Sequence, residues 1–141
     1  MESASEAVPY ELVARDSRSG HDEPTITAYR SLGSWREHWS SMHNKSCPAP
    51  PCPEPDLSGR MLIEITAGGT WTGMATLEVT AVQQRHGGLN VLATLDYPTG
   101  PCTDDIGNPF VVLTTPVFDS PVVLDLSVLH GIVRTAPPVT P

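Results

Sequence analysis

Two neighbouring stretches in which apolar and polar residues alternate constrain the fold of this chain most. Apolar side chains occupy positions 75, 77, 79 and 81, and residues 89–97 repeat the same pattern. A period of two places every second side chain on one face, which is typical of a half-buried β-strand. Gly87 and Gly88 lie between the two stretches and tolerate the positive φ angles of a tight turn. The pattern predicts a β-hairpin with Gly87-Gly88 as its two-residue turn.

Other short segments extend this β-rich pattern. The 15 prolines and 11 glycines of the 141-residue chain favour many turns over long helices. Residues 110–113 are continuously apolar, which is typical of a strand that is buried on both faces. Further strands are expected at residues 10–15, 25–30, 60–65 and 122–128. About seven short strands with one helix predict a mainly β domain, either an antiparallel sandwich or a barrel-like sheet.

One short segment has the periodicity of an amphipathic helix. Trp35, Trp39 and Met42 are spaced at i, i+4 and i+7, which gives a single apolar stripe. Residues 34–37 match a capping box, so we expect the helix to begin with Ser34 as its cap. The stripe favours packing of the helix on a sheet, and an aromatic recognition surface is the alternative.

The length and composition of the ends predict a single domain with two tails. A chain of 141 residues is long enough to bury a core of its own. We expect the domain to span residues 10–134. A flexible tail of residues 1–9 would precede it, and a flexible Pro-rich tail of residues 135–141 would follow it.

The charge balance restricts the partners of the chain. Eight basic residues against 16 acidic ones give a formal charge of −8. Nucleic-acid binding depends on basic residues that neutralise phosphates, so no nucleic-acid partner is expected. No run approaches the roughly 20 apolar residues of a membrane span. The polar N-terminus does not resemble a signal peptide. The protein is expected to be extracellular or periplasmic if a leader was removed, and cytoplasmic otherwise.

The three cysteines leave their pairing open. Cys47 and Cys52 flank a short Pro-rich loop, so they are candidates for a disulfide in an oxidising compartment and for free thiols in a reducing one. Zinc binding by these two with His38 and His43 is a third interpretation. The histidines are five residues apart, about 140° on a helix, which argues against a shared metal. No metal or cofactor is expected.

No recognised catalytic motif is present. The chain lacks the Gly-x-Ser-x-Gly elbow, the P-loop, the Gly-x-Gly-x-x-Gly fingerprint and the His-Glu-x-x-His motif. Asp104 and Asp105 lie beside Cys102, where carboxylates disfavour the thiolate. Together with Asn108 they could bind calcium, but their spacing differs from an EF-hand loop and a solvated acidic turn is favoured. We expect no enzymatic activity. A small enzyme that uses Cys102 or a His–acid pair stays an alternative.

The residues at the junctions between these elements form a recognisable series. The series is Ser34-Trp35-Arg36-Glu37, Pro55-Asp56-Leu57-Ser58, the strand 61–65, Thr72-Gly73, Gly87-Gly88, the loop 98–101, and Asn108-Pro109-Phe110 with Pro116. In this order it resembles the C-terminal domain of the protease complex subunit PrcB family, over roughly residues 25–120. The Thr-Gly-Gly-Tyr turn of that family is Thr72-Gly73-Met74-Ala75 here, so the tyrosine is absent and Trp71 is the nearby ring.

The resemblance implies a non-catalytic accessory module that binds another protein, with a protease complex as the candidate partner. Loops 66–74 and 98–109 would form the contact surface, because loops on a rigid sheet commonly carry recognition. A loop-presenting protease inhibitor of the chagasin-like type is the alternative, by analogy of fold alone. The residues expected at the surface are Trp71, Thr72, Gly73, Pro98, Gly100, Asp104, Asp105 and Asn108.

Overall fold

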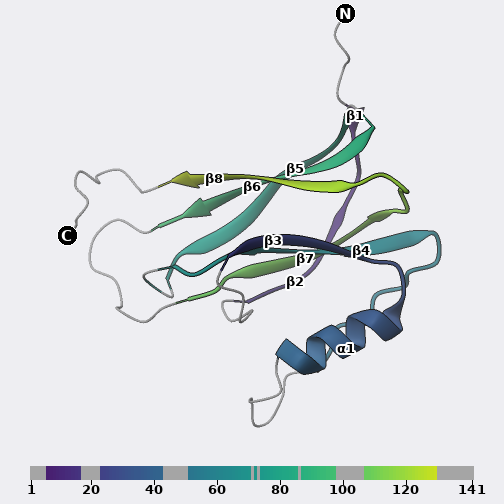
Figure 1. The fold of residues 1–141 in the computed structure, drawn as a ribbon, viewed down its shortest axis with the longest axis horizontal. Helices are drawn as coiled ribbons and strands as arrows, with labels where there is room; N and C mark the ends of the chain where they lie inside the picture. The colour runs from purple at the N-terminus through teal and green to yellow at the C-terminus, as the bar shows by residue number, and fades with distance from the viewer. Residues whose placement is uncertain are drawn as a thin grey trace, which may run out of the picture.

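The chain forms a sandwich of two four-stranded sheets, with one helix packed on the outer face of one sheet (Figure 1). The structure, a computed structural model, describes residues 6–16, 23–42, 51–70, 72, 74–85, 87–97 and 107–129. The prediction of a mainly β fold is confirmed, and of the two architectures considered the structure has the sandwich and no closed barrel. The elements are β1 (Glu6–Ala7), β2 (Glu11–Asp16), β3 (Pro24–Tyr29), α1 (Leu32–Met42), β4 (Arg60–Ala67), β5 (Thr76–Arg85), β6 (Gly88–Asp96), β7 (Phe110–Pro116) and β8 (Val122–Leu129).

The two sheets differ in the direction of one edge strand, β8 of sheet A. Sheet A has the order β1-β5-β6-β8, and sheet B has the order β2-β7-β4-β3. Neighbouring strands are antiparallel throughout, except that β8 runs parallel to β6. Because β7 belongs to sheet B and β8 to sheet A, residues 117–121 carry the chain from one layer to the other.

The alternating strands build the core between the sheets. Every second residue of β6 points inward, from Leu89 to Leu95, and the residues between them are only half-buried. Burying these side chains contributes roughly 25 cal/mol per Å² of apolar surface, which is the main term that holds the two layers together. The buried residues of this core are Val8, Met61, Ile63, Ile65, Ala67, Ala75, Leu77, Val82, Leu89, Val91, Ala93, Leu95, Tyr97, Val111 and Leu113.

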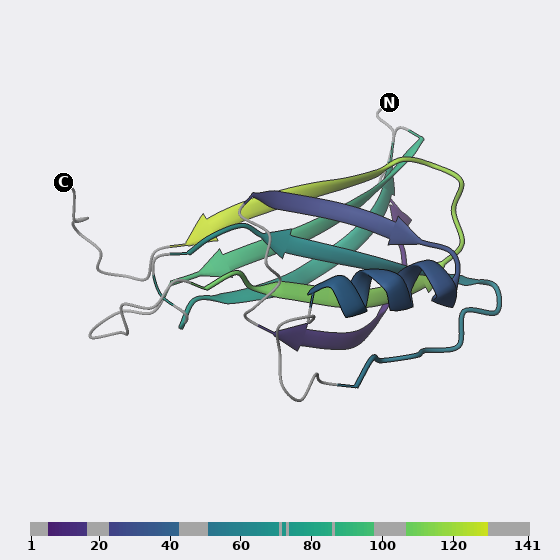
Figure 2. The ribbon, with the colours of Figure 1, turned by 60° about the horizontal axis from the view of Figure 1, so that its bottom comes forward.

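Helix α1 creates a second apolar layer on the other face of sheet B, as Figure 2 shows. Trp35 is completely buried and Trp39 is 7% exposed, so the packing interpretation of the tryptophan stripe is confirmed. The helix packs on Leu62 of β4 and on Phe110 and Val112 of β7. Strand β7 therefore lies between two apolar layers, as its continuous apolar run predicted.

The helix begins earlier than expected. Ser31, not Ser34, is the cap: its Oγ accepts a hydrogen bond from the Ser34 amide at 3.2 Å, and its carbonyl accepts the first intrahelical bond from the Trp35 amide at 3.3 Å. The capping-box prediction at residues 34–37 is wrong because serines occupy both positions, three residues apart, and the earlier one satisfies the free amides.

The first strand lies in the segment that we expected to be a tail. Glu6 and Ala7 pair with Gln84 and Gln83 of β5. Val8 donates a backbone hydrogen bond to Val82 at 2.8 Å and buries its side chain in the core. Residues 6–8 are therefore part of the sandwich, although they are too few to show an alternating pattern.

The hairpin of β5 and β6 is confirmed, but its turn lies one residue earlier than predicted. Arg85 pairs with Gly88, which leaves positions 86 and 87 between the strands. Gly87 has a φ of 74°, whereas Gly88 is the first residue of β6. The pair of glycines made the register ambiguous, because either could occupy the left-handed position.

This register makes a prediction for the two glycines. A Cβ at Gly87 meets nothing within 4 Å, so the cost of Gly87→Val is conformational and should be on the order of 1–3 kcal/mol of unfolding free energy. Gly88→Val is the matched control, because Val suits a strand and the nearest atom to its Cβ is the Pro121 carbonyl at 3.5 Å. Urea denaturation measures both variants. A larger loss for Gly88→Val than for Gly87→Val would contradict the register.

Candidate functional site

Two loops that are distant in sequence are joined at one end of the sandwich. Strand pairing brings the end of β4 beside the start of β7, so the loops that follow β4 and precede β7 are neighbours. Thr70 donates to the Gly107 carbonyl at 2.8 Å, and Gly107 donates back to Thr70 at 3.2 Å. The Ala67 amide donates to the Pro109 carbonyl at 3.1 Å. We call this joined region, described over residues 67–70, 72, 74 and 107–109, the loop end.

Threonine side chains hold the loop end from within. Thr70 is 3% exposed, and its Oγ1 donates to the Thr72 carbonyl at 2.8 Å. Thr72 is completely buried, and its Oγ1 accepts from the Met74 amide at 3.2 Å. Met74 itself is 46% exposed. The buried hydroxyls form hydrogen bonds with backbone groups that are removed from water. Met74 is therefore an exposed apolar side chain on a backbone that these hydrogen bonds hold.

The structure brings together part of the predicted contact surface. Asn108 is half-buried, and its Nδ2 lies 3.9 Å from the place of a Cβ at Gly69, so the two loops contact each other there. Thr72 supports the backbone and does not face outward. The other expected contact residues, Trp71, Gly73, Pro98, Gly100, Asp104 and Asp105, lie outside the described residues, and their role stays a prediction.

A second polar cluster lies between α1 and sheet B. Nε2 of His38 lies 2.9 Å from Oε1 and 3.1 Å from Oε2 of Glu64. The Glu64 side chain is 1% exposed and that of His38 is 22% exposed. The ring of Tyr29 stacks on His38 with centroids 5.5 Å apart, and Trp35 packs edge-on against Tyr29. A buried carboxylate needs a hydrogen-bonding partner, so the histidine fastens the helix to the sheet through Glu64.

The cluster changes the acidity of Tyr29. Burial, followed by the nearby Glu64 carboxylate, raises the pKa of the Tyr29 hydroxyl to about 12. A phenolate at this place would lose hydration and would repel Glu64, so the neutral phenol is favoured.

Sequence reasoning missed Glu64. The signal was a single acidic residue inside the apolar strand of residues 61–65. A strand in which both faces are buried leaves no solvent side for a charge, so such a residue needs a partner from another element. The zinc interpretation used His38, His43, Cys47 and Cys52, of which His43 and Cys47 lie outside the described residues. Among the residues that the structure describes, no three His, Cys, Asp or Glu side chains are grouped as metal ligands.

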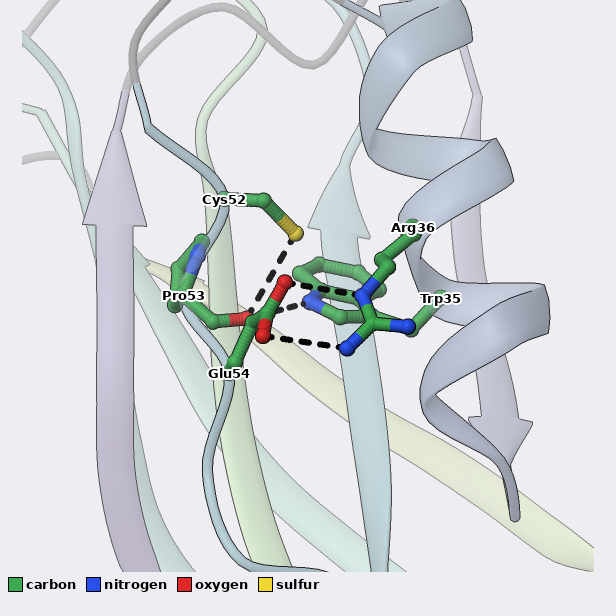
Figure 3. A network of polar contacts seen from close by, with 5 residues as sticks. All are labelled: Trp35, Arg36, Cys52, Pro53 and Glu54. Carbon is green, nitrogen blue, oxygen red and sulfur yellow. Dashed lines mark hydrogen bonds and ion pairs between the residues drawn. The ribbon is translucent and has the colours of Figure 1, made fainter.

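A third network fastens the connector before β4 to the helix (Figure 3). The Pro53 carbonyl accepts two hydrogen bonds, one from Nε1 of Trp35 at 2.8 Å and one from Sγ of Cys52 at 3.5 Å. Arg36 binds the Glu54 carboxylate through two nitrogens, at 2.8 and 3.1 Å. This bond holds the pKa of Glu54 below its usual range. The indole bond stabilises the buried position of Trp35, and the exposed ion pair adds little.

Cys52 is a free thiol in this structure. Burial is the larger cause and the neighbouring Glu54 carboxylate the smaller cause that raise the pKa of the Cys52 thiol. Less of the reactive thiolate is therefore present at neutral pH than for an ordinary cysteine. The disulfide between Cys47 and Cys52 stays a prediction, because Cys47 lies outside the described residues.

Comparisons of the chain with protein-family models, curated proteins and solved structures found no match. The resemblance to the PrcB family therefore rests on the junction residues alone. In the part of the chain that the structure describes, no helix has the length and apolar character that a membrane crossing needs.

The pKa of Tyr29 gives a direct test of the buried cluster. Because the folded-state pKa is raised, the fold favours the protonated phenol, and this stabilisation is present below pH 10 and is lost as the pH rises toward 12. The difference in absorbance at 295 nm between the wild type and Tyr29→Phe should have its titration midpoint near pH 12. Circular dichroism at each pH checks that the fold is intact. Glu64→Gln should lower this midpoint and leave it above 10, because burial is the larger cause. A midpoint near 10 in the wild type would contradict the cluster.

The pairing of His38 with Glu64 predicts an unusual order of stabilities. His38→Leu leaves the Glu64 carboxylate buried without its histidine and should cost roughly 2–4 kcal/mol of unfolding free energy. The double variant His38→Leu/Glu64→Leu removes the charge as well and should be more stable than the single variant. Chemical denaturation at pH 7 compares the two. A double variant that is less stable than His38→Leu would show that the pair does not act as a unit.

Proposed function

We propose that the chain is a non-catalytic accessory module that binds another protein through its loop end. The observation that carries this proposal is the pair of hydrogen bonds between Thr70 and Gly107, which joins the two loops that the sequence singled out. A protease complex is the candidate partner, because the junction residues resemble the PrcB family. The protease-inhibitor alternative uses the same surface.

The geometry of the loop end supports binding. Association costs free energy for every loop that must be ordered, and a surface held in one conformation before binding loses less. The buried hydroxyls of Thr70 and Thr72 hold the described backbone, and the hydrogen bonds of the bridge join Thr70 to Gly107. Met74 offers an exposed apolar side chain of the adaptable kind that protein interfaces favour.

The chemistry of the described residues also favours a binding role. His38, the one histidine among the described residues, is paired with Glu64 beneath the helix and fastens it to the sheet. The thiol of Cys52 has a raised pKa, and its Sγ contacts the neighbouring Pro53 carbonyl. A nucleophile needs a nearby base and an exposed reacting atom, and neither group provides both.

Photo-crosslinking tests the proposed surface. A benzoylphenylalanine at position 74 should capture one specific protein in cells of the source organism, because Met74 is exposed at the loop end. The same residue at position 37 is the control, since Glu37 is an exposed residue of α1, which packs on the outer face of sheet B. Capture of the same protein from both positions, or of none from position 74, would contradict the proposal.

An inhibition assay separates the accessory module from the inhibitor. Titration of papain and subtilisin with the purified chain should leave their activities unchanged if the chain is an accessory module. Stoichiometric inhibition of either enzyme that is lost in Met74→Asp would instead assign the loop end to a protease inhibitor.

A further inference from the structure

The outer edge of β8 pairs with no other strand in the part of the chain that the structure describes. Its ladder with β6 runs without interruption from Val122 opposite Leu89 to Leu129 opposite Asp96. Among the described residues, β6 is the one strand that pairs with β8. The backbone N–H and C=O groups that point away from β6 therefore have no strand partner among the described residues, and another strand could pair with them.

The other three edge strands carry features that oppose pairing. Strand β1 has two residues. Strand β2 is interrupted by a bulge between Leu12 and Ala14, and β3 begins with Pro24, which has no N–H to donate. Strand β8 has eight residues, a continuous register, no proline and one charged residue, Asp125. Proteins protect their edges with short strands, bulges, prolines and charges, so β8 is the least protected edge of this sandwich.

Exposed apolar side chains gather at the same edge. Val123 is 48% exposed and Val128 is 46% exposed, although both belong to a regular strand. Strand β3 of the other sheet lies beside β8, as both views show (Figures 1 and 2). Apolar side chains that are only partly buried in the core lie along this side of the sandwich: Ile26, Ala28, Phe118, Val122, Leu124 and Leu126. A strand added here would cover apolar surface as well as backbone groups.

We propose that β8 pairs antiparallel with β8 of a second copy of this chain, so that one sheet A runs through a symmetric dimer. The proposal does not depend on the proposed function, because the loop end lies at the ends of the strands and β8 forms a side. In a two-fold dimer the same surface of each copy forms the interface, so a single edge strand is enough to form it.

The two faces of β8 restrict the register. A two-fold axis perpendicular to the sheet keeps the core face of both copies on the same side, and residues that lie opposite each other in an antiparallel pair share a face. The two residue numbers in each pair must therefore add to an even sum. A register is named here by the sum of the two residue numbers in each pair. The registers of 250 and 252 each pair seven residues of Val122–Leu129, which is more than any other even sum allows.

Charge selects between these registers, because both of them place an apolar residue of the core face opposite Val128. A sum of 250 places Asp125 opposite its own copy, and opposed like charges are unfavourable. A sum of 252 places Asp125 opposite Ser127, whose hydroxyl can donate to the carboxylate. The same register places Val128 opposite Leu124 on the core face, which covers the exposed Val128. The sequence of β8 is therefore self-complementary in one register.

The acidic charge of the chain does not prevent this contact. The formal charge is −8 for each copy, but charges separated by more than about 8 Å are largely screened at physiological salt. In the register of 252 the two Asp125 side chains lie on a diagonal, about 7–8 Å apart. Their repulsion is modest, and the dimer should be tighter at higher salt.

Sedimentation equilibrium of the full chain, from about 1 μM to 1 mM, tests the proposal. We expect a monomer–dimer equilibrium that Val128→Lys weakens at least about tenfold, because the new charge would lie against Leu124 of the other copy. Leu12→Lys is the matched control, since Leu12 is 52% exposed on the bulged edge of sheet B and should leave the dimer unchanged. A monomer at every concentration overturns the proposal, as does a dimer that withstands Val128→Lys.

Disulfide trapping tests the register. In a background with the three native cysteines replaced by serine, Asp125→Cys and Ser127→Cys chains should form a mixed disulfide dimer when they are combined and oxidised. Each variant alone should crosslink at least about fivefold less, because the diagonal distance exceeds the roughly 4 Å between Cβ atoms that a disulfide requires. Efficient crosslinking of Asp125→Cys with itself overturns the register of 252.

Discussion

The structure depends on the burial of both faces of the two central strands of sheet B. Met61, Ile63 and Ile65 of β4 face the core between the sheets, whereas Leu62 faces the helix. Strand β7 divides its side chains in the same way, with Val111 and Leu113 on one side and Phe110 and Val112 on the other. The helix, the two sheets and the connector before β4 are thus layers around these two strands. A strand with no solvent face cannot shift its register by one residue without burying the wrong side chains, so the layers also fix each other's positions.

This arrangement explains why the polar groups near the helix are so closely paired. The Glu64 side chain is 1% exposed, and its carboxylate is paired with His38 of the helix. The Trp35 indole would leave its N–H unsatisfied without the Pro53 carbonyl. Each bond crosses between elements that are distant in sequence, so the polar contacts specify where the helix sits, while the apolar contacts supply most of the stability.

The sequence predicted the elements whose signals are periodic. Strands β5 and β6, the doubly buried β7 and the packing of Trp35 and Trp39 follow from spacing alone, because burial on a regular element repeats with its period. Signals that depend on single residues were misplaced: the cap was expected at Ser34 and lies at Ser31, and the turn lies one residue earlier than expected. The loop pairing of Thr70 with Gly107 and the pair of His38 with Glu64 depend on tertiary contacts between separate elements. No local pattern encodes such contacts, although the acidic residue within β4 marked that one was needed.

The topology of sheet A has a consequence for the order in which the chain folds. Its outer strands come from opposite ends of the described chain, β1 at residue 6 and β8 at residue 129, and the hairpin β5–β6 lies between them. During synthesis the hairpin can form early, but β6 gains its second neighbour only after residues 122–129 have left the ribosome. Strand β2 waits in the same way, because its sheet partner is β7, about a hundred residues later. Folding of this sandwich is therefore expected to be slow, and the core between the sheets is completed only after β8 has been synthesised.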